Sequence, residues 1–335
     1  MQNIGVLGTG TWGTALLRLL ANKGHTVTAW SALPEEVEAL SAARRHPKLP
    51  GMTIPDSVIF TADIAAACRG RDMLVFAVPS PYVRTTARAA APFVAKDQLI
   101  VDVAKGMEAE TLMTLTEVIG EEMAKHGKAP RLAALSGPTH AEEVSRDLPT
   151  TIVSASPDAR AAAQVQSAFM TDRLRVYTNA DIRGVEVAGA LKNVIALAAG
   201  IAGGLGYGDN ARAAIITRGI AEMARLGAAM GCPKETFSGL TGLGDLVVTC
   251  TSMHSRNNRC GMLIGQGKAA DEAVREVGMV VEGLNALPAA LKLGKKYGVE
   301  LPIIEGVHGI VDLGVSPREM VAELMRREPK PENWI

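Results

Sequence analysis

The sequence lacks the cysteine and histidine patterns that mark disulfide frameworks and metal sites. Its four cysteines form no Cys-x-x-Cys pair, and its six histidines form no His-Glu-x-x-His motif. We therefore expect Cys68, Cys232, Cys250 and Cys260 to be reduced thiols in a cytoplasmic protein. For the same reason, metal binding is not expected.

An excess of either charge is also lacking, because Lys plus Arg and Asp plus Glu each number 35. No positive excess is available to hold phosphates along a surface, which disfavours nucleic acid as the main partner. The N-terminus carries no basic segment with a cleavage site, so no signal peptide is predicted. The apolar run at residues 194–205 is too short and too rich in glycine to span a bilayer, so membrane insertion is not expected.

What the sequence does contain is a glycine-rich turn close to its N-terminus. The apolar residues 4–7 lead into Gly8-Thr9-Gly10-Thr11-Trp12-Gly13, which opens a helix pattern, and residues 27–30 form the next strand pattern. In such a motif Gly8 allows a tight turn, Gly10 lets the backbone approach a pyrophosphate, and Gly13 lets helix and strand pack closely. The N-terminus of the helix favours the phosphates of a dinucleotide.

Residues 1–181 alternate strand and helix patterns. Strand-like apolar runs lie at 73–78, 99–103, 132–135, 151–155 and 174–177. This alternation predicts an α/β domain, a doubly wound Rossmann-type sheet of parallel strands with helices on both faces. It would be the dinucleotide-binding domain, with its ligands at the carboxyl edge of the sheet.

From residue 182 to residue 335 the alternation stops and helix patterns follow one another. They lie at 185–199, 211–230, 269–277, 284–297 and 318–326. We expect an all-helical C-terminal domain that binds the substrate, with the active site in the cleft between the two domains. Residues 328–335 are polar and broken by proline, which predicts a tail.

Lys192 interrupts a helix pattern that is otherwise apolar nearly all round, in Gly189-Ala190-Leu191-Lys192-Asn193-Val194-Ile195-Ala196. Such a helix is buried, and a buried lysine is costly unless it has a partner or a chemical task. Burial also favours the uncharged amine, which suits proton transfer. The alternative is a lysine that reaches solvent from a helix end, and the sequence does not decide between the two.

Two segments of the helical half carry polar groups suited to a ligand. Asp245 lies in the glycine-rich segment 239–246, either as a carboxylate held near a ligand or as a solvated acid in a flexible loop. Ser255-Arg256-Asn257 offers a guanidinium fork and neutral donors for a phosphate. Ser255 also suits the N-cap of a helix, and the two interpretations are compatible.

Two segments of the first half follow predicted strands. Lys105 comes after the strand pattern at 99–103, and the segment 136–143 comes after the pattern at 132–135. Both are therefore expected at the carboxyl edge of the sheet, near the cofactor. Within the second segment, His140 is a weaker candidate for the general base than Lys192.

Taken in order, these motifs resemble those of the bacterial NAD(P)-dependent glycerol-3-phosphate dehydrogenases. The resemblance runs from Ile4 to about Pro317, and the glycine-rich turn is its least specific part. The segments specific to the family are Gly189-Ala190-Leu191-Lys192-Asn193, Gly242-Leu243-Gly244-Asp245-Leu246 and Ser255-Arg256-Asn257. Lys105-Gly106, Ser136-Gly137-Pro138-Thr139 and Val281-Glu282-Gly283 complete the resemblance.

The resemblance implies interconversion of sn-glycerol 3-phosphate and dihydroxyacetone phosphate with NAD or NADP, in support of phospholipid synthesis, and it suggests a homodimer. Lys192 matches the proton-transfer lysine of the family. The matches to substrate contacts are Lys105, Gly137, Thr139, Lys192, Asp245, Ser255, Arg256 and Asn257. The matches to cofactor contacts, besides the three glycines Gly8, Gly10 and Gly13, are Thr11, Trp12, Lys105, Ala141, Arg256, Val280 and Glu282.

The chain departs from the family pattern at two places. Relatives often carry an acid where this chain has Gly203, and many carry a basic residue just after the second strand. Here Trp30-Ser31-Ala32-Leu33 contains neither an acid nor an arginine, and Arg44 and Arg45 are expected to be exposed helix charges. The sequence therefore predicts that both cofactors are used, with a preference under about tenfold.

Two other functions fit part of this pattern. A 3-hydroxyacid or 6-phosphogluconate-type dehydrogenase would share the two-domain plan, but a substrate without phosphate would leave Arg256 unexplained. A nicotinamide-binding sensor without catalysis would share the fold, since fold does not determine function. A sensor needs no proton donor inside an apolar helix, so Lys192 argues against it.

Overall fold

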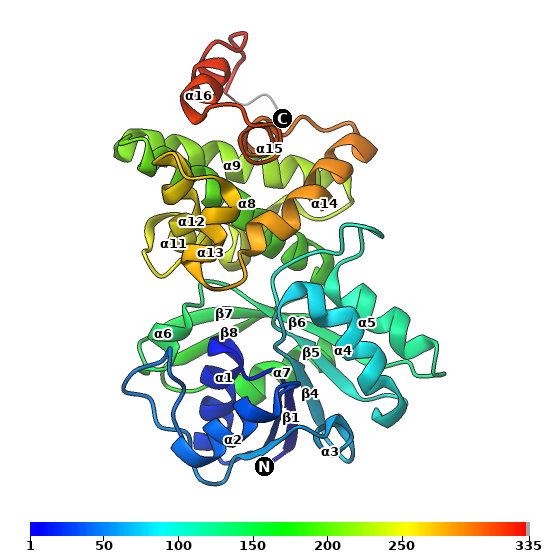
Figure 1. Cartoon of the computed structure of the whole chain (residues 1–335). Helices are drawn as coiled ribbons and strands as arrows, with labels where there is room; N and C mark the ends of the chain where they lie inside the picture. The colour runs from blue at the N-terminus through cyan, green and yellow to red at the C-terminus, as the bar shows by residue number, and fades with distance from the viewer. Residues whose placement is uncertain (333–335) are drawn as a thin grey trace. The chain divides into compact units, whose positions relative to one another are not determined.

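A sheet of eight strands lies at the centre of the N-terminal part of the chain (Figure 1). The computed structural model describes residues 1–332. The strands lie in the order β3–β2–β1–β4–β5–β6–β7–β8. The chain leaves β3 and returns to the other side of β1, so the strand order reverses between β1 and β4, as in a doubly wound sheet. The strands are β1 (Asn3–Leu7), β2 (Thr26–Trp30), β3 (Ile59–Thr61), β4 (Met73–Phe76), β5 (Leu99–Asp102), β6 (Arg131–Ser136), β7 (Thr150–Ala155) and β8 (Leu174–Asn179).

Helices cover both faces of this sheet, as the alternating pattern predicts. In β4, Val75 belongs to the buried cluster that also contains residues of α1, α6 and α7. The neighbouring Leu74 and Phe76 point to the opposite face, into a cluster with residues of α3, α4 and α5. The helices are α1 (Thr11–Asn22), α2 (Pro34–Ala43), α3 (Ile64–Cys68), α4 (Val83–Ala90), α5 (Leu115–Ala124), α6 (Ala141–Val144) and α7 (Ala159–Phe169).

Strands β7 and β8 run opposite to the other six strands of the sheet. Strand β7 pairs antiparallel with β6, with Ala134 opposite Ala155, whereas the other pairs in the sheet are parallel. The doubly wound sheet is confirmed, but the expectation of parallel strands fails at the β6–β7 pair. The physical reason is the connection between β6 and β7, which contains only the four-residue helix α6. A parallel return usually uses a full helix packed on the sheet, which this connection lacks.

The C-terminal part of the chain is helical, as predicted. The chain divides into two compact units, Met1–Lys105 with Met113–Ile182, and Gly106–Leu112 with the chain from Arg183 onwards. A π-helical turn, Leu240–Gly244, precedes α11 in the second unit. Its helices are α8 (Ile182–Gly204), α9 (Asp209–Ala229), α10 (Lys234–Ser238), α11 (Asp245–Thr251), α12 (Arg256–Gly265), α13 (Ala270–Val277), α14 (Glu282–Tyr297), α15 (Pro302–Val311) and α16 (Pro317–Met325).

Helix α8 is longer than the apolar run in the sequence indicates. It has 23 residues and a window of mean hydropathy 1.6, so by length and composition alone it could cross a membrane. The expected run at 194–205 thus belongs mostly to a helix that begins at Ile182, twelve residues earlier than that run. Within the structure, 94% of that window is buried. The helix forms the middle of the apolar core of the second unit, where Leu191, Val194 and Ile195 pack.

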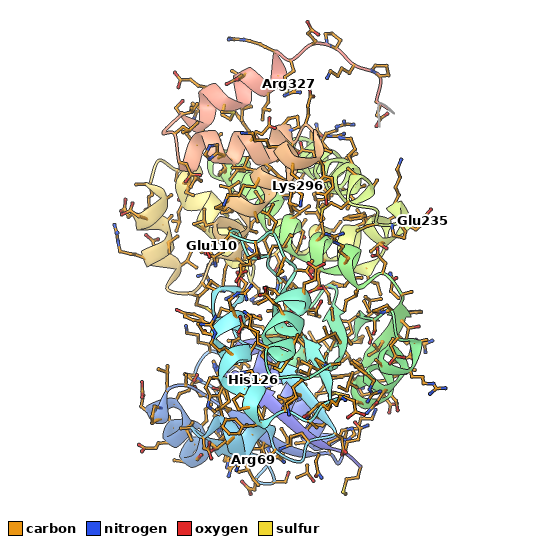
Figure 2. The ribbon with its side chains drawn as sticks, turned by 90° about the vertical axis from the view of Figure 1, so that its right-hand side faces the viewer. Arg69, Glu110, His126, Glu235, Lys296 and Arg327 are labelled. Atoms are coloured by element: carbon orange, nitrogen blue, oxygen red, sulfur yellow. The ribbon has the colours of Figure 1, made fainter. Side chains whose placement is uncertain are left out.

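The tail that follows α16 folds back onto the helices of its own unit. Arg327, labelled in Figure 2, and Lys330 both pair with the carboxylate of Glu300, at 3.0 and 3.3 Å. Arg218 of α9 donates to the carbonyl oxygen of Glu332 at 3.3 Å. Residues 333–335, the end of the predicted tail, lie outside the described residues.

Helices α8 and α12 approach each other so closely that glycine is required at their contact. A Cβ atom added at Gly261 would lie 2.2 Å from the carbonyl oxygen of Leu197, and one at Gly200 would lie 2.1 Å from that of Asn258. Backbone therefore packs against backbone at this crossing. Gly203 differs from these positions, because the nearest atom to an added Cβ is Cγ of Met262 at 3.8 Å.

We expect Gly261→Ala to lower the free energy of unfolding by about 1–3 kcal/mol, the usual cost of forcing extra atoms into a packed core. Gly203→Ala is the matched control, and it should be neutral or stabilising because alanine favours a helix more than glycine does. Thermal denaturation of the two variants and the parent protein makes the comparison. Equal loss in both variants would show that the close approach of α8 and α12 is not what Gly261 provides.

Helix α15 is joined to α9 by the carboxylate of Glu222, whose residue is only 3% exposed. Its two oxygens accept hydrogen bonds from the backbone N–H groups of Ile303 and Ile304, at 2.8 and 3.4 Å, in the first turn of α15. Burial raises the pKa of Glu222 from 4.5 to about 7, and the nearby Glu305 adds to this, whereas the two backbone hydrogen bonds and Arg225 oppose it.

The raised pKa of Glu222 predicts that stability falls as pH rises. Between its ordinary pKa of 4.5 and its folded pKa of about 7, the folded protein keeps a proton that the unfolded chain releases. The effect should reach about 3 kcal/mol above pH 7 and vanish below the unfolded pKa. Melting temperatures measured from pH 4.5 to pH 8 should therefore fall less steeply for Glu222→Gln than for the parent. The exposed Glu235→Gln is the control, and identical slopes for all three proteins would contradict the assignment.

Candidate active site

The glycine-rich turn connects β1 to α1 and has the geometry that a pyrophosphate needs. Gly8 adopts a φ of +115°, and a Cβ added at Gly10 would meet no atom within 4 Å. Gly10 is the N-cap of α1, which has no side-chain cap and no acidic residue in its first turn. Its first N–H groups are thus oriented towards open space, where an anion would be stabilised by the helix dipole. The half-buried Thr11 and Trp12 begin the helix beside this space.

At the carboxyl ends of β5 and β6, three of the predicted residues come together. The ammonium group of Lys105 donates to the carbonyl oxygen of Gly137 at 2.8 Å and to Oγ1 of Thr139 at 2.9 Å. These two strands are neighbours in the sheet, so the segments that follow them meet at the same edge. Ala141, a predicted cofactor contact, is the first residue of α6 just beyond and is 7% exposed.

In the helical unit, Lys192 lies in the middle of α8 and is 5% exposed. Its Nζ donates to Oδ1 of Asp245 at 2.9 Å and to Oγ1 of Thr249 at 2.7 Å. Asp245 is itself only 1% exposed. The alternatives of a lysine reaching solvent from a helix end and of a solvated acid in a flexible loop are therefore both excluded. The ammonium group is buried and is balanced by one carboxylate.

Thr249 is a member of this centre that the sequence analysis missed. It lies one turn after Asp245 on α11, so both side chains lie on the same face of that helix. Its hydroxyl donates to the carbonyl oxygen of Asp245 at 2.6 Å, which leaves its oxygen lone pairs directed at Lys192. The spacing of four residues from Asp245 would have indicated Thr249, had the sequence pattern indicated a helix there.

Ser255 begins α12 as predicted, because its side-chain oxygen accepts from the N–H of Asn258 at 3.1 Å. Arg256 is the first residue of that helix and is half-buried. Asn257 is 7% exposed, and its side chain joins two other helices. Its Nδ2 donates to Oδ1 of Asn193 on α8, and its Oδ1 accepts from the N–H of Gly283 on α14, both at 2.8 Å.

The last two predicted cofactor residues flank the start of α14. Glu282 is the first residue of that helix, and its carboxylate accepts a hydrogen bond from Nδ2 of Asn285 at 3.2 Å. Val280 precedes it and is half-buried. Since Asn257 binds the N–H of Gly283, the segment carrying both residues is fastened to α12. Their contact with a cofactor stays a prediction.

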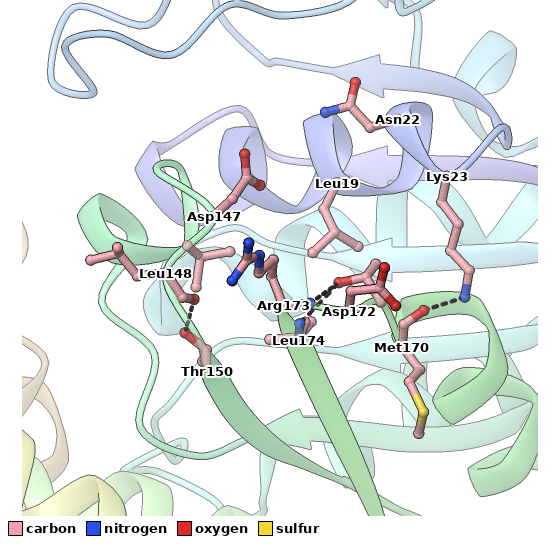
Figure 3. A pocket seen from close by; sticks show the side chains of 12 residues that line it. Leu19, Asn22, Lys23, Asp147, Leu148, Thr150, Met170, Asp172, Arg173 and Leu174 are labelled. Atoms are coloured by element: carbon pink, nitrogen blue, oxygen red, sulfur yellow. Dashed lines mark hydrogen bonds between the residues drawn. The ribbon is translucent and has the colours of Figure 1, made fainter.

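A pocket of about 710 Å³ lies elsewhere in the first unit (Figure 3). It is formed at the C-terminal end of α1 by residues such as Leu19 and Lys23, together with Thr150 and Arg173. Lys23 donates to the carbonyl oxygen of Met170 inside it. The glycine-rich turn lies at the other end of α1, about 18 Å away at 1.5 Å per residue. None of the predicted site residues lines this pocket.

Comparison with known proteins gives one consistent family. Models of the N-terminus and the C-terminus of NAD-dependent glycerol-3-phosphate dehydrogenase match residues 3–162 and 181–322. A glycerol-3-phosphate dehydrogenase (NAD(P)+) of Lactobacillus delbrueckii subsp. bulgaricus is 60% identical over 99% of both chains. The one from Agathobacter rectalis is 51% identical over 99% of this chain and 98% of the relative. The crystal structure of glycerol-3-phosphate dehydrogenase from Coxiella burnetii is 37% identical, covers 97% of this chain and 99% of its own, and has a TM-score of 0.92.

Proposed function

Because the chain belongs to the NAD-dependent glycerol-3-phosphate dehydrogenase family, we propose that it interconverts dihydroxyacetone phosphate and sn-glycerol 3-phosphate with NAD or NADP. The observation that supports catalysis most directly is the buried ammonium group of Lys192, bonded to Asp245 and Thr249. A protein that only binds a nicotinamide cofactor has no use for a charged group at that cost. The bound cofactor supplies the hydride for reduction and accepts it in the reverse direction.

Lys192 acts on the oxygen atom that changes between ketone and alcohol. In reduction, its ammonium group polarises the carbonyl oxygen and then donates the proton that the new hydroxyl needs. Asp245 and Thr249 hold Nζ through hydrogen bonds of 2.9 and 2.7 Å, so the group is oriented before the substrate arrives. In oxidation the same amine takes up the proton.

The other predicted residues bind and orient the substrate and the cofactor. Arg256, at the start of α12, supplies a guanidinium fork for the phosphate of the substrate, with Ser255 and Asn257 beside it. Lys105, Gly137 and Thr139 contact the substrate as a cluster held by the hydrogen bonds of Lys105. The glycine-rich turn with Thr11 and Trp12 would hold the pyrophosphate of the cofactor. Ala141, Val280 and Glu282 contribute further contacts to it.

We place this reaction in the cytoplasm, as a source of glycerol 3-phosphate for phospholipid synthesis. The four cysteines are free and buried, which suits a reducing compartment. A homodimer is the oligomeric state suggested by the family resemblance, and sedimentation analysis would test it. The activity itself is tested by following the absorbance of reduced nicotinamide with dihydroxyacetone phosphate. Turnover with this substrate is expected, and its absence would refute the proposal.

Replacing the proton donor should affect turnover far more than cofactor binding. We expect Lys192→Ala to lower kcat by about a hundredfold or more, the usual contribution of an acid–base group. Lys295→Ala, at an exposed position on α14, is the control and should be normal. Fluorescence titration with reduced nicotinamide checks that the variant still folds and binds the cofactor. Normal turnover by Lys192→Ala would show that another residue transfers the proton.

Arg256 should determine the preference for a phosphorylated substrate. We expect Arg256→Ala to raise KM for dihydroxyacetone phosphate by about thirtyfold, the value of a lost charge-assisted hydrogen bond. The ratio of catalytic efficiencies for dihydroxyacetone phosphate and dihydroxyacetone should fall with it, whereas Arg275→Ala, at an exposed position on α13, should keep that ratio. Arg256 is also a predicted cofactor contact, so some loss of cofactor affinity would not contradict its role in phosphate binding. If the variant keeps the parent's preference, the phosphate binds elsewhere.

A further inference from the structure

A carboxylate lies at the carboxyl end of β2, although the residues directly after this strand include no acid. It belongs to Glu36, in the first turn of α2. Its Oε2 accepts hydrogen bonds from Oγ1 of Thr9 at 2.8 Å and from Oγ of Ser31 at 2.5 Å. Thr9 belongs to the glycine-rich turn, and Ser31 directly follows β2. Glu36 is therefore held between the turn that binds pyrophosphate and the end of the second strand.

The local sequence explains how a helix residue reaches this place. Helix α2 begins at Pro34, almost directly after β2 ends at Trp30. Proline at the first position fixes the start of the helix. The N–H of Leu33 donates to Oγ of Ser31 at 3.2 Å, which tightens the turn between strand and helix. As a result, the first turn of α2 folds back over the end of β2, and Glu36 points at Ser31 and Thr9.

The carboxylate is positioned but keeps one oxygen available. Thr9 and Ser31 are only 2% and 5% exposed, so the two hydroxyl groups that hold Oε2 are fixed by the surrounding structure. Within residues 1–332, Oε1 of Glu36 has no hydrogen-bond partner, and Glu36 forms no salt bridge. The negative charge is therefore not neutralised by a lysine or arginine. Burial lowers the pKa of the nearby His46, and the carboxylate of Glu36 partly opposes that lowering.

The arginine closest in sequence is engaged on the other side of this segment. Arg44 donates through a guanidinium nitrogen to the carbonyl oxygen of Val58 at 2.7 Å. Its guanidinium also lies 5.7 Å from the centre of the Phe60 ring, and its Nε is 3.7 Å from the carboxylate of Asp56. Arg44 is thus held against β3 and the loop before it. The neighbouring Arg45 is exposed, as expected.

In a Rossmann-type domain, an acid at the end of the second strand binds the ribose 2′-hydroxyl of NAD, and an arginine there accommodates the 2′-phosphate of NADP. We propose that Glu36 takes the first role in this chain and makes it selective for NAD. Oε1 accepts the hydrogen bond of the 2′-hydroxyl, and the charge of the carboxylate repels a 2′-phosphate. This inference rests on the proposed function and refines its cofactor. It replaces the nearly equal use of both cofactors expected from residues 30–33 alone.

The test measures binding rather than turnover. Dissociation constants for NADH and NADPH are obtained by nicotinamide fluorescence for the parent, for Glu36→Gln and for the control Glu38→Gln, an exposed position on the same helix. We expect the parent to bind NADH at least about thirtyfold more tightly than NADPH, because the Glu36 carboxylate repels the 2′-phosphate of NADPH. Glu36→Gln should reduce this ratio by about tenfold or more, mainly through tighter NADPH binding, since glutamine carries no charge. Glu38→Gln should keep the parent's ratio.

A ratio below thirtyfold in the parent, or an unchanged ratio in Glu36→Gln, would overturn the proposal. Should Glu36→Gln not fold, competition on the parent protein decides. AMP should displace NADH, and adenosine 2′,5′-bisphosphate should do so at least tenfold less well, in proportion to the repulsion of its 2′-phosphate. Equal displacement would refute the role of Glu36. None of these measurements needs dihydroxyacetone phosphate, so a failure of the proposed reaction and a failure of NAD selection are seen separately.

Discussion

The contact of backbone on backbone between α8 and α12 is the constraint on which the helical unit depends. Helix α8 carries Lys192 and Asn193, and α12 begins with Arg256 and Asn257. Because Gly200 and Gly261 have no side chains, the two helices approach until the carbonyl oxygens of each lie where a Cβ would otherwise be. At this separation, the short side chain of Asn257 reaches Oδ1 of Asn193 at 2.8 Å. The same side chain accepts the hydrogen bond of the Gly283 N–H, so the contact between α8 and α12 also positions the start of α14.

The buried pair of Lys192 and Asp245 is difficult to explain by stability. Taking two charges out of water costs several kcal/mol each, and apolar residues of similar volume often give a protein about 1–4 kcal/mol more stable. Thr249 reduces this cost with a further hydrogen bond but does not remove it. A chemical task for the ammonium group gives a reason for its presence. The helix around it, apolar nearly throughout, then serves to exclude water from that group and to strengthen its electrostatic effect.

The features that the sequence predicted correctly depend on residues that lie close together in the chain. The glycine-rich turn and the capping role of Ser255 each depend on neighbouring residues, whereas the burial of Lys192 was left open by the sequence and is decided by the structure. The direction of β7 depends instead on how its connection packs, which no local pattern records. Thr249 was missed because α11 follows a π-helical turn, where no regular helical period leads into it. Glu36 was missed because its place beside Thr9 depends on how sharply α2 follows β2.

Around α1, the groups that bind the cofactor differ from the group that selects between NAD and NADP. The N–H groups at the start of α1 would contact the pyrophosphate, which NAD and NADP share, so this backbone cannot distinguish them. Discrimination must come from a side chain near the adenosine ribose, the one place where the two cofactors differ in charge. Glu36 is held there by two buried hydroxyl groups rather than by a cation, which fixes its position without cancelling its charge. An arginine partner would have fixed it equally well but would have removed the repulsion on which selection depends.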